Sequence, residues 1–153
     1  MYTLDITDIK ILNCLQQDGR ISERQLAALV FKSPPTVNER LSKLQERGYI
    51  RRFTVLLDRQ KIGQPVLVVT HVRLERQTTE LLNAFEEAVK RLPEVPCLLH
   101  VSGGWNFILH VTATTPQAYF SFIMEHINSL GNIGGMESCF VMRECKSDGP
   151  FVL

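Results

Sequence analysis

The sequence predicts an α+β chain in two parts, a bundle of three short helices with a two-stranded ribbon and then a β-α-β-β-α-β unit. Three observations lead to this prediction. Apolar residues recur at helical spacing through the first part, with capping residues before the helices. Strand-like and helix-like segments alternate through the second part. The charge changes at the same boundary, because residues 1–61 carry eleven Lys and Arg and seven Asp and Glu, whereas residues 62–153 carry six and nine.

The bulk composition is that of a folded globular protein. Of the 153 residues, 44 % are hydrophobic and 22 % are charged, which is ordinary for soluble domains. No apolar run approaches the roughly 18 residues of a membrane-spanning helix, and no basic-then-apolar signal peptide begins the chain. We therefore expect a cytoplasmic protein with no membrane partner. The cysteines form no C-x-x-C pair, and three of the four lie in apolar runs, where we expect free thiols to pack as small hydrophobic residues.

The three helices of residues 1–61 are predicted from their caps and apolar stripes. The first helix is expected over 7–17. The second begins after Ser22 and the third after Ser33, because a serine hydroxyl accepts a bond from a backbone N–H of the first turn. Pro34 suits the first position of the third helix, and Gly48 suits the left-handed conformation that ends it.

The segment after the third helix is predicted to form a short ribbon over 49–57, where apolar residues alternate. Arg51 and Arg52 are expected near its tip. Two helices joined by a tight link and followed by a ribbon form a winged helix-turn-helix, whose second helix enters the major groove of double-stranded DNA. The helical periodicity alone leaves open a solvated bundle that binds nothing.

The third helix is the predicted recognition helix. Its inward stripe includes Val37 and Leu44, so its polar residues face outward. Asn38 suits an adenine edge, Glu39 suits a cytosine amino group, and Thr36 suits a thymine methyl group. Basic residues beside this face suit phosphates, which set register and affinity. The predicted DNA-binding residues are Ser33, Pro35, Thr36, Asn38, Glu39, Arg40, Lys43, Arg47, Arg51 and Arg52.

The second part follows a boundary at Gly63-Gln64-Pro65. Strands are expected over 66–74, 97–102, 105–112 and 136–145, and helices over 78–92 and 116–130. This order of elements predicts a ferredoxin-like βαββαβ fold.

Short motifs spread in order along nearly the whole chain add a further observation. They are Leu4-Asp5-Ile6-Thr7-Asp8-Ile9-Lys10-Ile11-Leu12, Asp18-Gly19-Arg20-Ile21-Ser22, Ser33 with Val37, Arg40, Leu44, Gly48, Tyr49 and Ile50, then Leu56-Leu57-Asp58, Ile62-Gly63 and Pro93-Glu94-Val95. Together they resemble the Lrp/AsnC, or feast/famine, family of regulators. The resemblance implies a sequence-specific DNA-binding transcriptional regulator that is modulated by a small molecule.

The resemblance also implies a role for each part. Residues 1–61 resemble a winged helix-turn-helix DNA-binding domain with a linker strand, and residues 62–153 resemble the effector-binding and oligomerisation domain often called RAM. Homodimers that pair sheet to sheet, an octamer of four dimers, and an amino-acid effector bound between dimers are implied. The implied effector-binding residues are Ser102, Gly103, Gly104, Trp105 and Asn106.

Asn106 departs from the family pattern, which usually has aspartate at this position. An aspartate forms an ion pair with the α-amino group of an amino acid, whereas asparagine offers a neutral acceptor. Gly103 and Gly104 still let a carboxylate approach the backbone N–H groups closely. An ordinary amino acid, a different or weakly bound ligand, and no ligand therefore all stay open.

No motif predicts catalysis, a metal ion or a cofactor. The sequence has no G-x-S-x-G motif, no phosphate-binding loop and no Cys–His spacing typical of a nucleophile. His100 and His110 on neighbouring predicted strands would supply only two metal ligands. Three hypotheses follow: a ligand-responsive transcription factor, an effector-independent architectural DNA-binding protein, and an effector-binding assembly whose first part no longer binds DNA.

Overall fold

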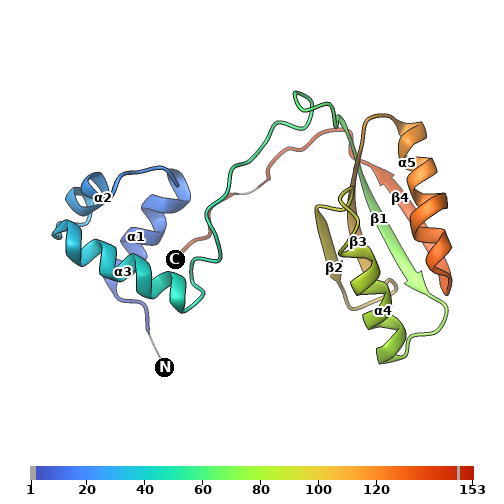
Figure 1. Ribbon diagram of the computed structural model, residues 1–153, viewed down its shortest axis with the longest axis horizontal. Helices are drawn as coiled ribbons and strands as arrows, with labels where there is room; N and C mark the ends of the chain where they lie inside the picture. Colours follow the sequence, from blue (N-terminus) through green and yellow to red (C-terminus); the bar gives the residue numbers. More distant parts are fainter. Residues whose placement is uncertain (1–2, 148) are drawn as a thin grey trace. The chain divides into compact units, whose positions relative to one another are not determined.

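The computed structural model describes residues 3–147 and 149–153 (Figure 1). The chain forms two compact units. The head comprises Met1–Leu56 with Lys146–Leu153, and the body comprises Leu57–Cys145. None of the described helices is both long and apolar enough to cross a bilayer.

The head contains the three predicted helices, each with the expected type of cap. They are α1 Ile6–Gln17, α2 Glu23–Leu29 and α3 Pro34–Glu46. Asp5 caps α1 in a reciprocal capping box with Asp8, and Ser22 and Ser33 cap α2 and α3 through their hydroxyls. A small apolar core lies between the helices, made of Ile11, Leu12, Leu26, Ala27, Val30, Val37 and Leu44.

The predicted ribbon over 49–57 is not formed within this chain, although the structure describes all of these residues. The segment runs extended and carries no strand hydrogen bonding. Phe53, Val55 and Leu57 are 52 %, 72 % and 64 % exposed, so the alternating side chains have no face to bury against. An isolated two-stranded hairpin is marginal in water, which explains why the alternation alone does not produce it.

The C-terminal tail, Lys146–Leu153, belongs to the head, which the sequence did not predict. The Gln16 side chain hydrogen-bonds both backbone groups of Phe151, a residue of this tail. Its amide donates to the Phe151 carbonyl at 3.2 Å and accepts from the Phe151 N–H at 2.6 Å. Apolar residues of α1, of the extended segment and of the tail line a depression of about 370 Å³ beside this contact.

The body confirms the ferredoxin-like prediction. Four antiparallel strands lie in the order β2-β3-β1-β4, so the first strand is central and pairs with β3 and β4. Both helices contribute side chains to a single core. The elements are β1 Val66–Leu74, α4 Thr79–Val89, β2 Cys97–His100, β3 Phe107–Ala113, α5 Pro116–Phe122 and β4 Ile133–Phe140.

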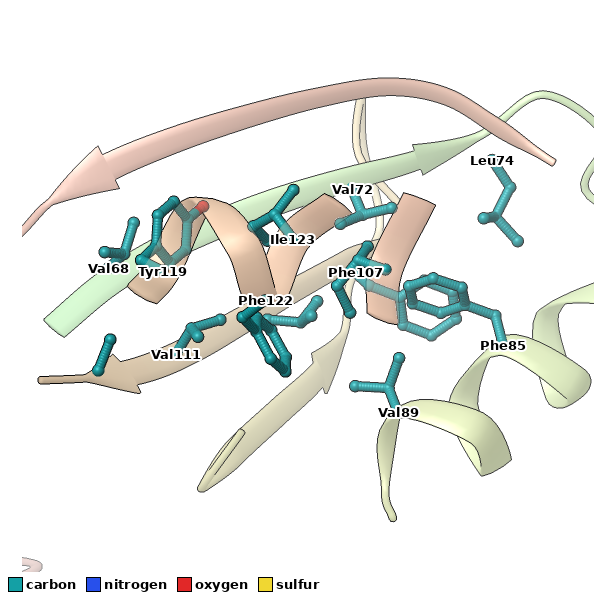
Figure 2. Packing of buried hydrophobic residues seen from close by; sticks show 13 residues of the cluster. Val68, Val72, Leu74, Phe85, Val89, Phe107, Val111, Tyr119, Phe122 and Ile123 are labelled. Carbon is teal, nitrogen blue, oxygen red and sulfur yellow. The ribbon is translucent and has the colours of Figure 1, made fainter. Parts of the chain in front are cut away.

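The core of the body lies between the sheet and the two helices (Figure 2). Alternate residues of β1 and β3 are buried, as a half-covered sheet requires. The rings of Phe85 on α4 and Phe107 on β3 pack with centroids 4.7 Å apart. On α5 the fully buried Tyr119 keeps its hydroxyl satisfied, because it hydrogen-bonds the Thr70 hydroxyl at 2.8 Å. The core therefore fixes β1 and β3 and the loop that precedes β3.

The second predicted helix of the body, expected over 116–130, changes its hydrogen bonding along its length. It is α-helical over Pro116–Phe122, forms a π-helical turn over Ile123–Ile127, and ends as a 3-10 turn over Asn128–Leu130. Gly131, with φ +69°, ends the helical path before β4.

Candidate DNA interface and effector loop

The orientation of α3 is fixed by its two buried apolar residues. Val37 and Leu44 are both fully buried in the core of the head. Ser33 accepts a bond from the Thr36 N–H at 3.4 Å, which starts the helix at Pro34. One side of α3 is thus held inward, and the opposite side is left for a ligand.

The polar residues predicted to read DNA do lie on exposed parts of α3. Thr36 is half-buried, and the residues exposed to solvent are Pro35, Asn38, Glu39, Ser42, Lys43 and Arg47. Thr36, Lys43 and Arg47 share one flank, because residues separated by four or seven positions lie on the same side of a helix. This flank of α3 therefore carries a hydroxyl and two cations, spaced along its length.

Glu39 and Lys43 form an ion pair one helical turn apart. Lys43 Nζ donates to Glu39 Oε1 at 2.6 Å, and this bond lowers the pKa of the Glu39 carboxyl. An exposed pair of this kind contributes little in water. Both side chains can therefore exchange this contact for one with DNA.

Asn38 lies on the flank of α3 opposite Lys43. It contributes to a shallow depression of about 290 Å³ together with Leu41 and Gln45 of α3 and residues of α1 and α2. Its backbone carbonyl accepts a bond from the Ser42 hydroxyl at 3.1 Å. Its side chain is exposed at the edge of the recognition face and not at its centre, where Glu39 lies.

Arg40, which was predicted to contact phosphate, is held by two carboxylates at the start of α1. Its Nη1 donates to Asp5 Oδ2 at 2.6 Å and to Asp8 Oδ1 at 2.7 Å, and the Asp8 side chain is 1 % exposed. The Asp8 N–H first, and then Arg40, lower the pKa of the Asp5 carboxyl. A buried carboxylate needs such a partner, so Arg40 ties α3 to the start of α1. The signal in the sequence was Asp8 itself, which shares a helical face with the buried Ile11 and Leu12.

Arg51 and Arg52 also differ from their predicted positions. Both are exposed, but they follow α3 in the extended segment and are not at the tip of a ribbon. They line the depression that also contains Phe151 and Leu153 of the tail. Their charges stay available to a polyanion.

The effector loop, residues 101–106, connects β2 and β3. Ser102, Gly103 and Gly104 are exposed, and Gly103 has φ +119°, a conformation that favours glycine. Trp105 is half-buried, with the Arg73 guanidinium carbon 5.9 Å from its ring centroid. The loop therefore places two exposed glycines near an aromatic side chain and a cation.

Asn106, which was predicted to contact the effector, has its side chain turned into the fold. It is only 8 % exposed, and its Oδ1 accepts a bond from the Leu74 N–H at 2.9 Å. Its own N–H donates to the Val72 carbonyl at 2.9 Å. The pairing of β1 with β3 stops at Val72. The Leu74 N–H, two residues further along β1, therefore needs an acceptor other than a backbone carbonyl of β3. Asn106 supplies that acceptor and joins the effector loop to β1.

Both parts of the chain match known family models. Residues 4–51 match the winged helix-turn-helix DNA-binding model, and residues 67–151 match the Lrp/AsnC ligand binding domain. The Bkd operon transcriptional regulator of Pseudomonas aeruginosa is 32 % identical over 143 residues, which are 94 % of each chain. This chain belongs to the Lrp/AsnC family. It is a DNA-binding transcriptional regulator with a ligand-binding domain, as the resemblance implied.

Two other regulators match along nearly the full chain. The leucine-responsive regulatory protein of Escherichia coli is 31 % identical over 150 residues, which are 98 % of this chain and 92 % of that protein. The crystal structure of a Neisseria meningitidis transcriptional regulator in complex with L-methionine has a TM-score of 0.91 and 28 % identity, and the match covers 98 % of this chain and 97 % of that chain.

Sequence reasoning missed three features of this Lrp/AsnC chain. The ion pairs of Arg40 with Asp5 and Asp8 were not predicted. The contact between Gln16 and Phe151 joins residues 135 positions apart, which no local pattern reveals. Phe31, in the link before α3, has a positive φ of 54° that its residue type does not suggest.

Proposed function

We propose that this regulator binds a specific double-stranded DNA sequence through α3, and that a small molecule bound by the body changes this binding. The observation that carries the proposal is the polar outer face of α3, which Val37, Leu44 and the Arg40 ion pairs hold in a fixed orientation. A fixed helix presents its side chains to base edges in one register.

The proposed DNA contacts fall into two groups. Pro35, Thr36, Asn38 and Glu39 are near the N-terminal end of α3, which enters the groove in helix-turn-helix proteins, so they meet base edges. Cationic side chains meet phosphates, and the hydroxyl of Ser33, the N-cap of α3, also meets a phosphate oxygen. The cations assigned to phosphates are Lys43, Arg47, Arg51 and Arg52.

The proposed effector is an amino acid or a closely related carboxylate held by Ser102, Gly103, Gly104 and Trp105. The Neisseria regulator was crystallised with L-methionine, which supports this class. Glycine N–H groups suit a carboxylate, and Trp105 suits an apolar side chain. Asn106 acts here by holding the loop on β1 and not by binding the amino group.

The proposed assembly is a homodimer, with four dimers forming an octamer. Two heads would read a roughly palindromic site with half-sites about one helical turn apart. A ligand between dimers would shift the assembly equilibrium and so change how many heads bind one DNA molecule.

One observation favours a second candidate, an effector-independent architectural DNA-binding protein. The Asn106 amide is turned inward and engaged by the Leu74 N–H, so the loop has no carboxylate at this position for an ammonium group. A regulator without an effector would keep the head and use its assembly to bend or wrap DNA.

The test of DNA binding uses the purified full-length chain and a randomised duplex library. Enrichment of one preferred sequence, with an affinity that falls linearly on a log–log plot against salt, supports the proposal. Equal affinity for every duplex favours the architectural candidate. No binding at low salt contradicts both.

The test of effector binding follows thermal melting with each of the twenty amino acids, in parallel for the Asn106→Asp variant. A ligand that binds the folded state raises the melting temperature. A shift for one or a few amino acids that also changes DNA affinity supports the proposal. A shift for Asn106→Asp alone indicates a loop that lacks only its ion-pair partner, and no shift for either protein favours the architectural candidate.

A further inference from the structure

Phe31 has an unusual combination of backbone conformation and exposure. It lies in the link between α2 and α3, its φ is +54°, and it is 85 % exposed. A bulky residue is a genuine outlier in this region, because its Cβ crowds the backbone. Such outliers cluster at functional sites.

The backbone of the link requires the left-handed conformation. After α2, the Lys32 N–H bonds to the Ala27 carbonyl at 3.0 Å and the Phe31 N–H bonds to the Ala28 carbonyl at 3.3 Å. This pair of bonds is the Schellman ending, whose central residue is usually glycine. Gly48, with φ +76°, has the same sign of φ just after α3. At Phe31 the chain accepts the strain of a large residue and gains almost no burial for it.

The position of Phe31 points to DNA as the partner of its ring. It comes two residues before Ser33, the N-cap of α3, and next to the exposed Lys32. In a helix-turn-helix, this end of the recognition helix enters the major groove. The one apolar group that bases present there is the methyl group of thymine, and phenylalanine is a side chain that reads it.

We propose that Phe31 is a specificity-determining residue, whose ring contacts the methyl group of a thymine at one position in each half-site. The inference rests on the proposed function, because it requires α3 to bind in the major groove. A protein partner fits less well, because a specific interface buries about 800 Å² per partner, and this ring lies beside a cation near the recognition face.

The experiment replaces thymine by uracil, one position at a time, in the duplex that the full-length chain selects from a random library. Uracil keeps every hydrogen-bonding group and removes only the methyl group. At the position that Phe31 contacts in each half-site, which is separate from any position that Thr36 contacts, wild-type protein is expected to lose about fourfold in affinity, the effect of losing one buried methyl group. Phe31→Gly and Phe31→Ala are expected to bind the thymine and uracil duplexes equally.

A second readout separates recognition from structure. Phe31→Gly relieves the backbone strain, so its melting temperature is expected to rise by about 5 °C while its affinity for the thymine duplex falls. Phe31→Ala keeps the positive φ and is expected to lose the uracil effect without the rise. Phe151→Ala is the matched control, because Phe151 is an 80 % exposed phenylalanine of the same unit, and its uracil scan should equal that of wild type.

Two outcomes overturn the inference. Wild-type and Phe31→Gly proteins with identical uracil scans would show that the ring meets no thymine methyl group, even though the protein binds DNA. A wild-type chain that selects no sequence removes the proposed function itself, and this result is seen before any variant is compared.

Discussion

Helix α3 and the predicted effector loop both carry polar residues, but they present them differently. On α3, Glu39 and Lys43 are exposed while the fully buried Val37 and Leu44 hold the opposite side. In the effector loop, exposed Gly103 is followed by Asn106, whose amide is turned into the fold. In a helix, one repeat decides which side chains face inward and which face outward. In a loop, a polar side chain turns toward whichever backbone group lacks a hydrogen-bond partner. Polar character alone therefore predicts which side chains face solvent more reliably on α3 than in the loop.

The largest expected effect comes from removing the ion pairs that hold α3 to the start of α1. Arg40→Ala leaves the carboxylate of Asp8 buried without its cation, so we expect the head to lose about 3 kcal/mol of unfolding free energy. Urea unfolding of the full-length chain measures the loss. Lys43→Ala, one turn along the same helix, should leave the urea midpoint nearly unchanged. An equal, small effect of both changes would mean that Arg40 is a surface cation after all.

The next effect tests the loop. Asn106→Ala removes the acceptor of the Leu74 N–H and leaves a buried donor unsatisfied, which we expect to destabilise the body by about 2 kcal/mol. Amide hydrogen exchange at Leu74 is the direct measurement, with faster exchange expected. Ser102→Ala in the exposed part of the same loop is the control. Unchanged exchange at Leu74 would free Asn106 for a role in ligand binding.

A smaller effect concerns the pH dependence of stability and tests the ion pair between Asp5, at the start of α1, and Arg40 on α3. The hydrogen bond from Asp8 and the Arg40 cation lower the folded-state pKa of Asp5. A lowered pKa adds stability that is fully present above the unfolded value near 3.9 and is lost as the pH falls through the folded value. Urea midpoints of the wild type should therefore drop on acidification below about pH 4, and less so for Asp5→Asn. Parallel curves for the two proteins would contradict this.

The smallest effect concerns the tail. Gln16→Ala removes two exposed hydrogen bonds to the Phe151 backbone, so we expect a change of about 1 kcal/mol or less. Carboxypeptidase digestion should nevertheless shorten the tail faster, because its attachment to α1 is lost. Gln17→Ala is a suitable control, since Gln17 is the exposed neighbour at the end of the same helix. Equal digestion of both variants would exclude the contact.

Much of the fold was predictable because local rules and the core agreed. Ser22 and Ser33 mark helix starts by their chemistry, and the alternation in β1 and β3 marks a half-covered sheet. The prediction of a ribbon over 49–57 was wrong for this chain. Alternating apolar residues form a strand only where a second surface covers the face that they share.

The site was less predictable than the fold. The outward residues of α3 followed from its period, but the partner of Arg40 lies 32 to 35 positions away on α1. The inward turn of Asn106 depends on where the β1–β3 register stops, which the sequence does not reveal. The positive φ of Phe31 could not be predicted from its residue type, because the hydrogen bonds that end α2 impose this conformation.

The central claim is that the outer face of α3 reads DNA sequence, and Glu39 lies at the centre of that face. Selection from a random duplex library by wild-type and Glu39→Ala proteins tests it most directly. The account predicts that Glu39→Ala still binds duplex DNA but accepts other base pairs at one position per half-site, where wild type requires cytosine opposite guanine. An unchanged preference at every position would contradict the claim.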